Sequence, residues 1–227
     1  MKTALITLTW GRPNAFPAWL QRLKTQTFTD FDLIVSNSNR DHDHFIETEL
    51  RKADLPFSAY FRADSNDRLA FRRFDIAKEL KYDRYVILDD DVTISDNFMA
   101  DMVAQYQPNT YHSWFCWQIL SDDYHDRKRV TKQNQPIHYA GIGISMLDRS
   151  IVDRPELYNV PEAGMFSEDI WLTYVMQHIY KWPVKWTPIP NVVLGGADDV
   201  ALYMRISKSK HRKIDFYREL LATGWHQ

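Results

Sequence analysis

A short apolar run that ends in three consecutive carboxylates is the feature that most constrains this chain. Residues 85–88 (Tyr, Val, Ile, Leu) lead directly into Asp89, Asp90 and Asp91, and apolar residues resume at Val92. Such a run predicts a buried β-strand. Three acids at the end of a buried strand repel one another, so each resists ionisation. A divalent cation would offset this repulsion, and carboxylate oxygens are ligands that suit Mg²⁺ and Mn²⁺.

The competing interpretation of these acids is a solvated acidic turn between two elements. Open α/β sheets bind their ligands at the carboxyl ends of strands, which favours the metal interpretation. Because side chains alternate along a strand, we expect Asp89 and Asp91 to face one way and Asp90 the other.

Composition narrows the class of protein. A chain of 227 residues is long enough for one substantial core, and its net charge of -2 gives no indication of a nucleic-acid partner. The one cysteine, Cys116, has apolar neighbours, which predicts a packed thiol and excludes an intrachain disulfide. Without a signal-peptide pattern or an apolar run of membrane-spanning length, the sequence predicts a cytoplasmic protein. Peripheral attachment to a membrane is left open.

Strand and helix patterns alternate in the first part of the chain. Strands are expected over residues 4–9, 31–35, 57–62 and 85–88, and helices over 16–25, 44–52 and 69–80. This alternation predicts an α/β fold with a mostly parallel sheet and helices on both faces. No linker rich in Gly, Pro or Ser occurs, so we expect one domain over residues 1–227. This domain would have an α/β first half and a more mixed second half.

The second half has a more mixed pattern. Helices are expected over 96–106 and 166–180, strands over 113–120, 138–146 and 182–189, and an exposed loop or hairpin over 121–135. Two phosphate-binding signatures are missing from the sequence: Gly-x-x-x-x-Gly-Lys-Ser/Thr and Gly-x-Gly-x-x-Gly. Strand-end acids without a glycine-rich phosphate loop leave nucleotide-sugar chemistry as the best candidate.

Six segments in this order give the chain a family resemblance. They are residues 4–13, 36–39, 64–68 with the helix that follows, 88–92, 141–145 and 167–172. In order and spacing the chain resembles glycosyltransferases of the GT-A fold, particularly the inverting family-2-like enzymes of small viral or bacterial type. The resemblance implies a Rossmann-like nucleotide-binding half over about 1–95 and a mixed acceptor-binding half over about 96–227. It also implies transfer from a nucleoside-diphosphate sugar with Mn²⁺ or Mg²⁺ as cofactor.

The resemblance also implies a donor site and a metal site. The expected donor-binding residues are Thr9, Trp10, Arg12, Ser36, Asn37, Arg68, Arg72 (or Arg73 in its place), Asp89 and Asp90. For the arginines, a solvated helix face is an equally good explanation. The expected metal ligands are Asp91, Asp89 and, by position, His211, with His178 a weaker alternative.

Glu168 and Asp169 form the second expected centre. From the residues alone, acids that follow Ser167 are explained by helix capping and by the helix dipole. The resemblance implies that Asp169 is the general base for the acceptor hydroxyl and that Glu168 holds sugar hydroxyls.

The acceptor side and a lid complete the expected site. Acceptor contacts are expected from Trp114, Trp117, Trp171, Gly141 and Gly143, although the tryptophans could equally be core. Lys208, Lys210 and Arg212 are the expected cations of a lid hinged at 195–196; the alternative is a solvated charged tail.

The donor is expected to be of UDP, dTDP or GDP type and the acceptor to be a glycan or glycoconjugate. One alternative is a nucleotidyltransferase or nucleotide-sugar pyrophosphorylase, whose glycine-rich loop with Arg and Lys is missing near the N-terminus. Another is a non-catalytic nucleotide or carbohydrate binder, which would not need the acid pair 168–169.

Overall fold

The structure is a computed structural model that describes residues 1–65, 68–121, 123, 125–195 and 210–225, with only the backbone described for 210–212. A seven-stranded sheet in the order β11-β6-β10-β4-β1-β2-β3 runs through both halves of the chain. Its first four strands along the sequence are β1 (Thr3–Thr9), β2 (Asp32–Asn37), β3 (Ala59–Ala63) and β4 (Arg84–Leu88).

These four strands are mutually parallel, as the alternating pattern predicts. The connections carry the helices α1 (Phe16–Lys24), α2 (Asp43–Lys52) and α3 (Arg72–Leu80), with a 3₁₀ turn at Leu69–Phe71 before α3. Parallel neighbours need such crossovers, and each helix buries its apolar face on the sheet. The expected α/β fold is confirmed for this half.

The second half adds strands and helices to the same sheet. The strands are β5 (Val92–Thr93), β6 (Tyr111–Ser113), β7 (Cys116–Ile119), β8 (Arg127–Arg129), β9 (Tyr139–Ala140), β10 (Ile144–Asp148), β11 (Val184–Trp186) and β12 (Val193–Leu194). The helices are α4 (Phe98–Ala104), α5 (Arg149–Val152), α6 (Pro155–Tyr158), α7 (Glu168–Tyr174) and α9 (Lys210–Ala222). β10 is antiparallel to both its neighbours, β4 and β6. Smaller sheets pair β12 with β5 and place β7 between β8 and β9.

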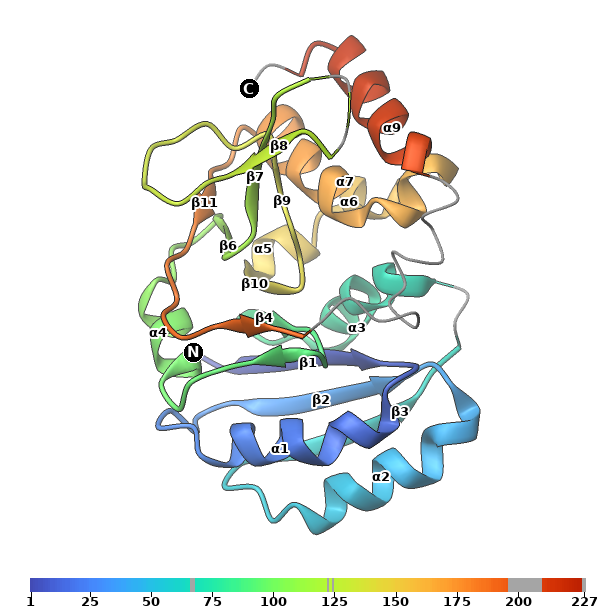
Figure 1. Cartoon of the computed structure of the whole chain (residues 1–227), viewed down its shortest axis with the longest axis vertical. Helices are drawn as coiled ribbons and strands as arrows, with labels where there is room; N and C mark the ends of the chain where they lie inside the picture. The colour runs from blue at the N-terminus through green and yellow to red at the C-terminus, as the bar shows by residue number, and fades with distance from the viewer. Residues whose placement is uncertain (66–67, 122, 124, 196–209, 226–227) are drawn as a thin grey trace.

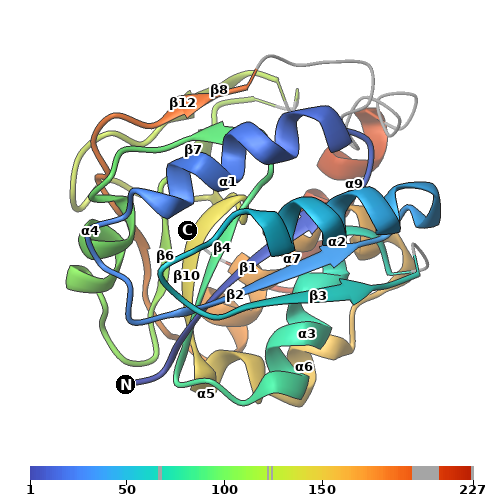
Figure 2. The same cartoon turned by 90° about the horizontal axis from the view of Figure 1, so that it is seen from below.

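Helices cover both faces of the large sheet (Figures 1 and 2). One apolar core lies under α1, α2 and α4 and includes Trp19, Leu33 and Phe98. The core on the other face lies under α3, α5, α6, α7 and α9, and includes Phe74 and Phe216. Cys116 is buried in this second core, as predicted for a packed thiol.

Three expected elements of the second half are divided in the structure. The strand expected over 113–120 leaves the large sheet after Ser113 and begins again at Cys116 in the small sheet. The strand expected over 138–146 is interrupted between Ala140 and Ile144. The helix expected over 166–180 begins at Glu168 and continues as a π-helical turn. The two strand breaks separate residues of the large sheet from residues of the small sheet, which a local apolar pattern does not reveal.

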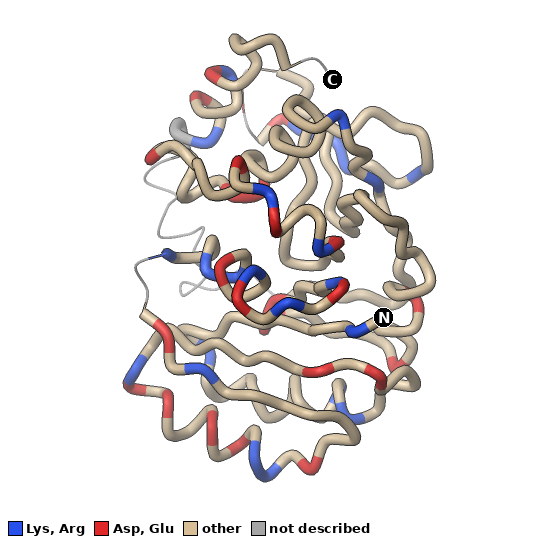
Figure 3. The backbone as a smooth tube through the Cα atoms, turned by 180° about the vertical axis from the view of Figure 1, so that it is seen from behind, with Lys and Arg blue, Asp and Glu red and all other residues tan. Residues whose placement is uncertain are grey.

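Among the described residues, no helix combines the length and the apolar character needed to cross a lipid bilayer. Positive and negative segments are interleaved over both halves in the view of Figure 3.

Candidate active site

The carboxyl ends of β1 and β2 meet at one edge of the sheet, where Thr9 pairs with Asn37. The Thr9 hydroxyl donates a hydrogen bond to Asn37 Oδ1 (3.1 Å), and both side chains are buried. Asn39 Nδ2 donates to the carbonyl of Trp10 (3.1 Å), which holds the loop after β1. The expected donor residues at these strand ends therefore lie together, and their hydrogen bonds shape the edge of the sheet.

Each of the two arginines expected to bind the nucleotide sugar forms an ion pair with an aspartate. Arg68 pairs with Asp75 (Nε–Oδ2 3.0 Å), and Arg72 Nη2 lies 2.5 Å from Asp64 Oδ1. Ser36 donates to the second oxygen of Asp64 (2.7 Å). Burial opposes ionisation of Asp64, but the hydrogen bonds from Arg72 and Ser36 outweigh it and hold its pKa below the usual value. Arg72 and Ser36 thus share one carboxylate between β2 and α3.

The three acids form a turn between β4 and β5, because β4 ends at Leu88. The expectation that the acids continue the strand is therefore wrong. Arg12 pairs with both Asp90 (3.2 Å) and Asp91 (3.4 Å), whereas Asp89 pairs with Arg73 on α3 (3.4 Å).

The exposed fractions of the three side chains still set Asp89 and Asp91 apart from Asp90, as expected. The side chains of Asp89 and Asp91 are 42% and 31% exposed, but that of Asp90 is only 11% exposed. Burial raises the pKa of Asp90 to about 7; the charges of Asp89 and Asp91 add to this effect, and Arg12 opposes it. The side chains of Asp89 and Asp91 are therefore partly accessible, whereas Asp90 packs against Arg12.

Two glycines approach this turn closely. Asp89 N–H donates to the carbonyl of Gly143 (2.8 Å), and Gly195 N–H donates to the carbonyl of Asp91 (2.7 Å). A Cβ on Gly143 would lie 2.0 Å from Asp89 Oδ2, and one on Gly195 would lie 2.5 Å from the carbonyl oxygen of Asp91. A side chain at Gly143 would therefore displace the carboxylate of Asp89, and one at Gly195 would displace the backbone of the turn.

The donor set fits a substrate-assisted metal site. Among the described residues, no three His, Cys, Asp or Glu side chains gather as a ready-made cation site. The turn instead supplies the two partly exposed carboxylates of Asp89 and Asp91. Mg²⁺ typically binds through one or two carboxylates plus substrate phosphates, so this pair suits it. The side chain of His211 lies outside the described residues.

Arg73 connects the acid turn with the acid pair at the start of α7. Its side chain is buried and contacts Asp89. Burial and the charge of Asp169 raise the pKa of Glu168, while the charges of Lys213 and Arg73 oppose the rise. The sequence predicts Arg73 only as an alternative to Arg72 among the donor-binding residues. Its spacing of four and seven residues from Ala77 and Leu80 would have marked it as facing the core.

The acid pair itself lies at the first turn of α7. Ser167 makes no side-chain capping hydrogen bond, so capping does not explain the serine. Asp169 is buried, and both its oxygens lie 3.3 Å from Nζ of Lys213 on α9. A buried aspartate of α7 and a lysine of α9 thus meet at this point.

The expected acceptor residues divide into two groups. Trp171 is core: it is buried, stacks on Tyr174 and donates its indole N–H to the carbonyl of Leu157 (2.9 Å). The expectation of an acceptor contact from Trp171 is wrong, because α7 turns this side chain toward α6 and α9. Trp114 and Trp117 are only partly buried, and each lies under an arginine of β8.

The backbone of Gly141 forms three hydrogen bonds with residues of β6 and the segment that follows it. Its carbonyl accepts hydrogen bonds from Ser113 (2.6 Å) and Tyr111 (3.0 Å), and its N–H donates to Phe115 (2.6 Å). Lys208 of the expected lid and Gly196 of the expected hinge lie outside the described residues, as do the side chains of Lys210 and Arg212.

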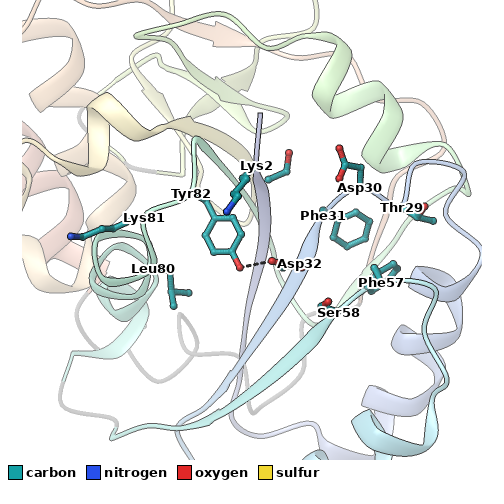
Figure 4. A pocket seen from close by; sticks show the side chains of 11 residues that line it. Lys2, Thr29, Asp30, Phe31, Asp32, Phe57, Ser58, Leu80, Lys81 and Tyr82 are labelled. Carbon is teal, nitrogen blue, oxygen red and sulfur yellow. Dashed lines mark hydrogen bonds between the residues drawn. The ribbon is translucent and has the colours of Figure 1, made fainter.

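A cavity of about 510 Å³ opens at the opposite, amino edge of the sheet (Figure 4). Lys2, Asp32, Phe57 and Tyr82 are among its lining residues, and the Tyr82 hydroxyl donates to Asp32 (2.6 Å). Lys2 and Thr9 lie at or beyond opposite ends of β1, so this cavity is separate from the acid turn.

No family model matches the sequence, and no curated protein matches it. Solved structures do match in fold. The mannosyltransferase PcManGT from Pyrobaculum calidifontis, in complex with GDP-Man and Mn²⁺, matches with a TM-score of 0.62 at 14% identity, over 92% of this chain and 61% of that chain. TarS 1-349 of S. aureus, in complex with UDP, matches with a TM-score of 0.56 at 15% identity, over 78% and 55%.

A cytidylyltransferase from Leptospira borgpetersenii matches with a TM-score of 0.51 at 18% identity, over 98% of this chain and 94% of that chain. This chain thus spans less than two thirds of the two glycosyltransferase structures but nearly all of the cytidylyltransferase. Together with the mostly parallel sheet and its acid turn, the matches establish that this chain has the GT-A fold of nucleotide-sugar glycosyltransferases.

Proposed function

We propose that this protein is a glycosyltransferase that moves a sugar, with inversion, from a UDP, dTDP or GDP sugar to a hydroxyl of a glycan or glycoconjugate. One observation carries the proposal: the partly exposed carboxylates of Asp89 and Asp91 lie at the carboxyl edge of a GT-A sheet. Ligands of open α/β sheets bind at this edge.

In this proposal Asp89 and Asp91 hold Mn²⁺ or Mg²⁺, with His211 as a further ligand. The bound ion would stabilise the charge that develops on the leaving diphosphate. Arg12 supports the turn by pairing with Asp90 and Asp91. Thr9, Trp10, Ser36 and Asn37 form the rim of the nucleoside pocket, and Arg68 and Arg72 flank it. Lys208, Lys210 and Arg212 are proposed to cover the diphosphate.

Asp169 is the proposed general base. An oxygen of its carboxylate would take the proton of the acceptor hydroxyl as the hydroxyl oxygen forms its bond to the anomeric carbon and the diphosphate leaves. Lys213 contacts this carboxylate now, so the acceptor hydroxyl would replace or adjoin the lysine at Asp169. Glu168, whose pKa is raised by burial, would hold hydroxyls of the sugars.

A nucleotidyltransferase is the second candidate, because the similar cytidylyltransferase has nearly the same chain length. Both functions would use the acid turn to hold a metal on phosphates. They differ in which bond breaks: the anomeric carbon–oxygen bond in a glycosyltransferase, and a phosphoanhydride bond in a nucleotidyltransferase.

One assay separates the candidates. The protein is incubated with Mn²⁺ and a panel of nucleotide sugars, and separately with nucleoside triphosphates and sugar phosphates. Release of a nucleoside diphosphate supports the glycosyltransferase. Release of pyrophosphate supports the nucleotidyltransferase, and thermal stabilisation by nucleotide without turnover indicates a binding protein.

Two variants test the assigned roles, with Asp153→Asn, which follows α5 at the amino edge of the sheet, as a control. We expect Asp91→Ala to abolish Mn²⁺-dependent donor binding, measured by calorimetry. We expect Asp169→Asn to bind donor normally but to transfer on the order of a hundredfold more slowly. Transfer at the wild-type rate by Asp169→Asn would reject it as the base.

A further inference from the structure

We propose that the acceptor is acidic and that Arg129 of β8 binds its phosphate or carboxylate group beside Trp114. This inference rests on the proposed function, because it concerns the substrate class of the same site. It concerns Arg129 and the aromatic side chains beside it, to which the proposed donor and metal sites give no role.

The sheet brings Trp114 close to the acid turn. β10 lies between β4 and β6, with Ile144 opposite Leu88 and Ser145 opposite Ser113. Because β10 is antiparallel to both, β4 and β6 run in the same direction, and the residues that follow them emerge at the same edge. Trp114 follows β6 and Asp89 follows β4. Two strand spacings separate them, which is about 10 Å.

Arg129 is stacked on this aromatic edge. Its guanidinium carbon lies 3.6 Å from the ring centroid of Trp114 and 5.3 Å from that of Phe115. In the described part of the chain Arg129 forms no ion pair, and its buried Nε has no hydrogen-bond partner. Its sole hydrogen bond there is a long one to the carbonyl of Trp114 (3.4 Å).

A half-buried cation without a counter-ion is unfavourable. Burial lowers the pKa of Arg129, which reflects this cost. An anion on a bound substrate would supply the missing partner, because the planar guanidinium matches the geometry of carboxylate and phosphate oxygens.

The neighbouring charges favour an anion at this place. β8 carries three cations in succession: Arg127, Lys128 and Arg129. Arg127 lies over the ring of Trp117 at 4.5 Å. Pairing of Arg129 with Trp117 and of Arg127 with Ile119 puts Arg129 at the base of the hairpin. The acids Asp123 and Asp126 belong to the hairpin tip, which is the other end.

The aromatic rings and the cations of this surface together suit an acidic sugar. The apolar face of a sugar ring packs on aromatic rings, while an acidic substituent binds arginine. The donor diphosphate is the competing anion, but the acid turn that would hold it lies two strands away from Trp114. The acceptor side is therefore the better assignment.

The test is a titration of the Trp114 indole N–H, observed by NMR and assigned with Trp114→Phe. The probes are glucose 6-phosphate, glucuronate, glucose and inorganic phosphate at constant ionic strength, and UDP with Mn²⁺. We expect saturable shifts with glucose 6-phosphate or glucuronate, and the stronger of the two identifies the acidic group. Glucose should produce no comparable shift.

Arg129→Gln should weaken this binding about tenfold or more, the scale of a lost charged hydrogen bond. Lys128→Gln, the same charge change at an exposed neighbour, should bind as the wild type does. If Arg129→Gln does not fold, Arg129→Lys is used instead. It retains the charge without the planar guanidinium, and it should bind the acidic sugar more weakly than the wild type does.

Several results would overturn the proposal: equal shifts with glucose, inorganic phosphate binding as tightly as the acidic sugars, a response to UDP alone, or unchanged binding in both Arg129 variants. Donor hydrolysis by the wild-type protein is measured in parallel. Hydrolysis without acidic-sugar binding rejects this inference alone, whereas no hydrolysis of any nucleotide sugar rejects the proposed function.

Discussion

At the scale of single residues, buried or partly buried cations pair with the acids of the candidate site. Arg12 pairs with Asp90 and Asp91, Arg73 with Asp89, and Lys213 with Asp169. Each pair keeps a carboxylate near the edge of the sheet in a fixed place.

His112 on β6 gives a pH-dependent prediction. Burial, assisted by the charge of Lys185, lowers the pKa of His112 to about 4, below the value of about 6.5 for an unfolded chain. As the pH falls below 6.5 the unfolded chain binds a proton and the folded chain does not. The stabilising contribution is therefore complete above pH 6.5 and is lost as the pH falls toward 4.

Between pH 7 and pH 5 we expect this residue to cost the wild type about 2 kcal/mol of unfolding free energy. His112→Asn lacks the titrating group, so its free energy of unfolding in urea should fall by about that much less over the same interval. Equal losses in the two proteins would contradict the pKa assigned to His112.

At the scale of elements, short loops between strands hold the acid turn. The interruption between β9 and β10 brings Gly143 against the side chain of Asp89, and the residue after β12 brings Gly195 against the backbone of Asp91. The turn is thus held from both sides by segments far away in the sequence.

These two glycines should respond differently to substitution by alanine. In Gly143→Ala the new Cβ meets the end of a flexible carboxylate, so Asp89 can rotate away at a small cost in stability. We expect its melting temperature to stay near that of the wild type while Mn²⁺-dependent donor binding weakens about tenfold, the effect of one displaced ligand.

Gly195→Ala serves as the comparison, because its Cβ meets the backbone carbonyl of Asp91, which cannot rotate away. Its melting temperature should fall more than that of Gly143→Ala. The reverse order of melting temperatures would show that the loops yield more easily than the turn.

At the scale of the whole molecule, one sheet joins the two halves. β10 pairs with β4 along Ile144–Asp148, and both cores contain residues from each half. The predicted halves are therefore not independent in their packing, although they differ in architecture (Figure 1).

A fragment of residues 1–95 should consequently fail to fold. It would expose the edge of β4 and lose the packing of Phe98 and Met146 in the core under α1. We expect poor amide dispersion in its NMR spectrum, whereas the full chain should show coincident unfolding by circular dichroism and tryptophan fluorescence. A dispersed spectrum with a cooperative melt of the fragment would indicate an autonomous half.

The amino-acid sequence by itself determined the alternation of strands and helices up to Leu88 and the position of the acids at a strand end. It also determined the burial of Cys116. These features follow from local periodicity and from side-chain chemistry, which neighbouring residues are enough to specify.

Only the tertiary structure decided which cation each acid contacts, that Trp171 is core, and that Arg129 lies over the ring of Trp114. Arg73 meets Asp89, and Lys213 meets Asp169 across 44 residues of chain. Such contacts depend on how the layers stack and on where a strand leaves one sheet for another. A local pattern of apolar residues determines neither of these.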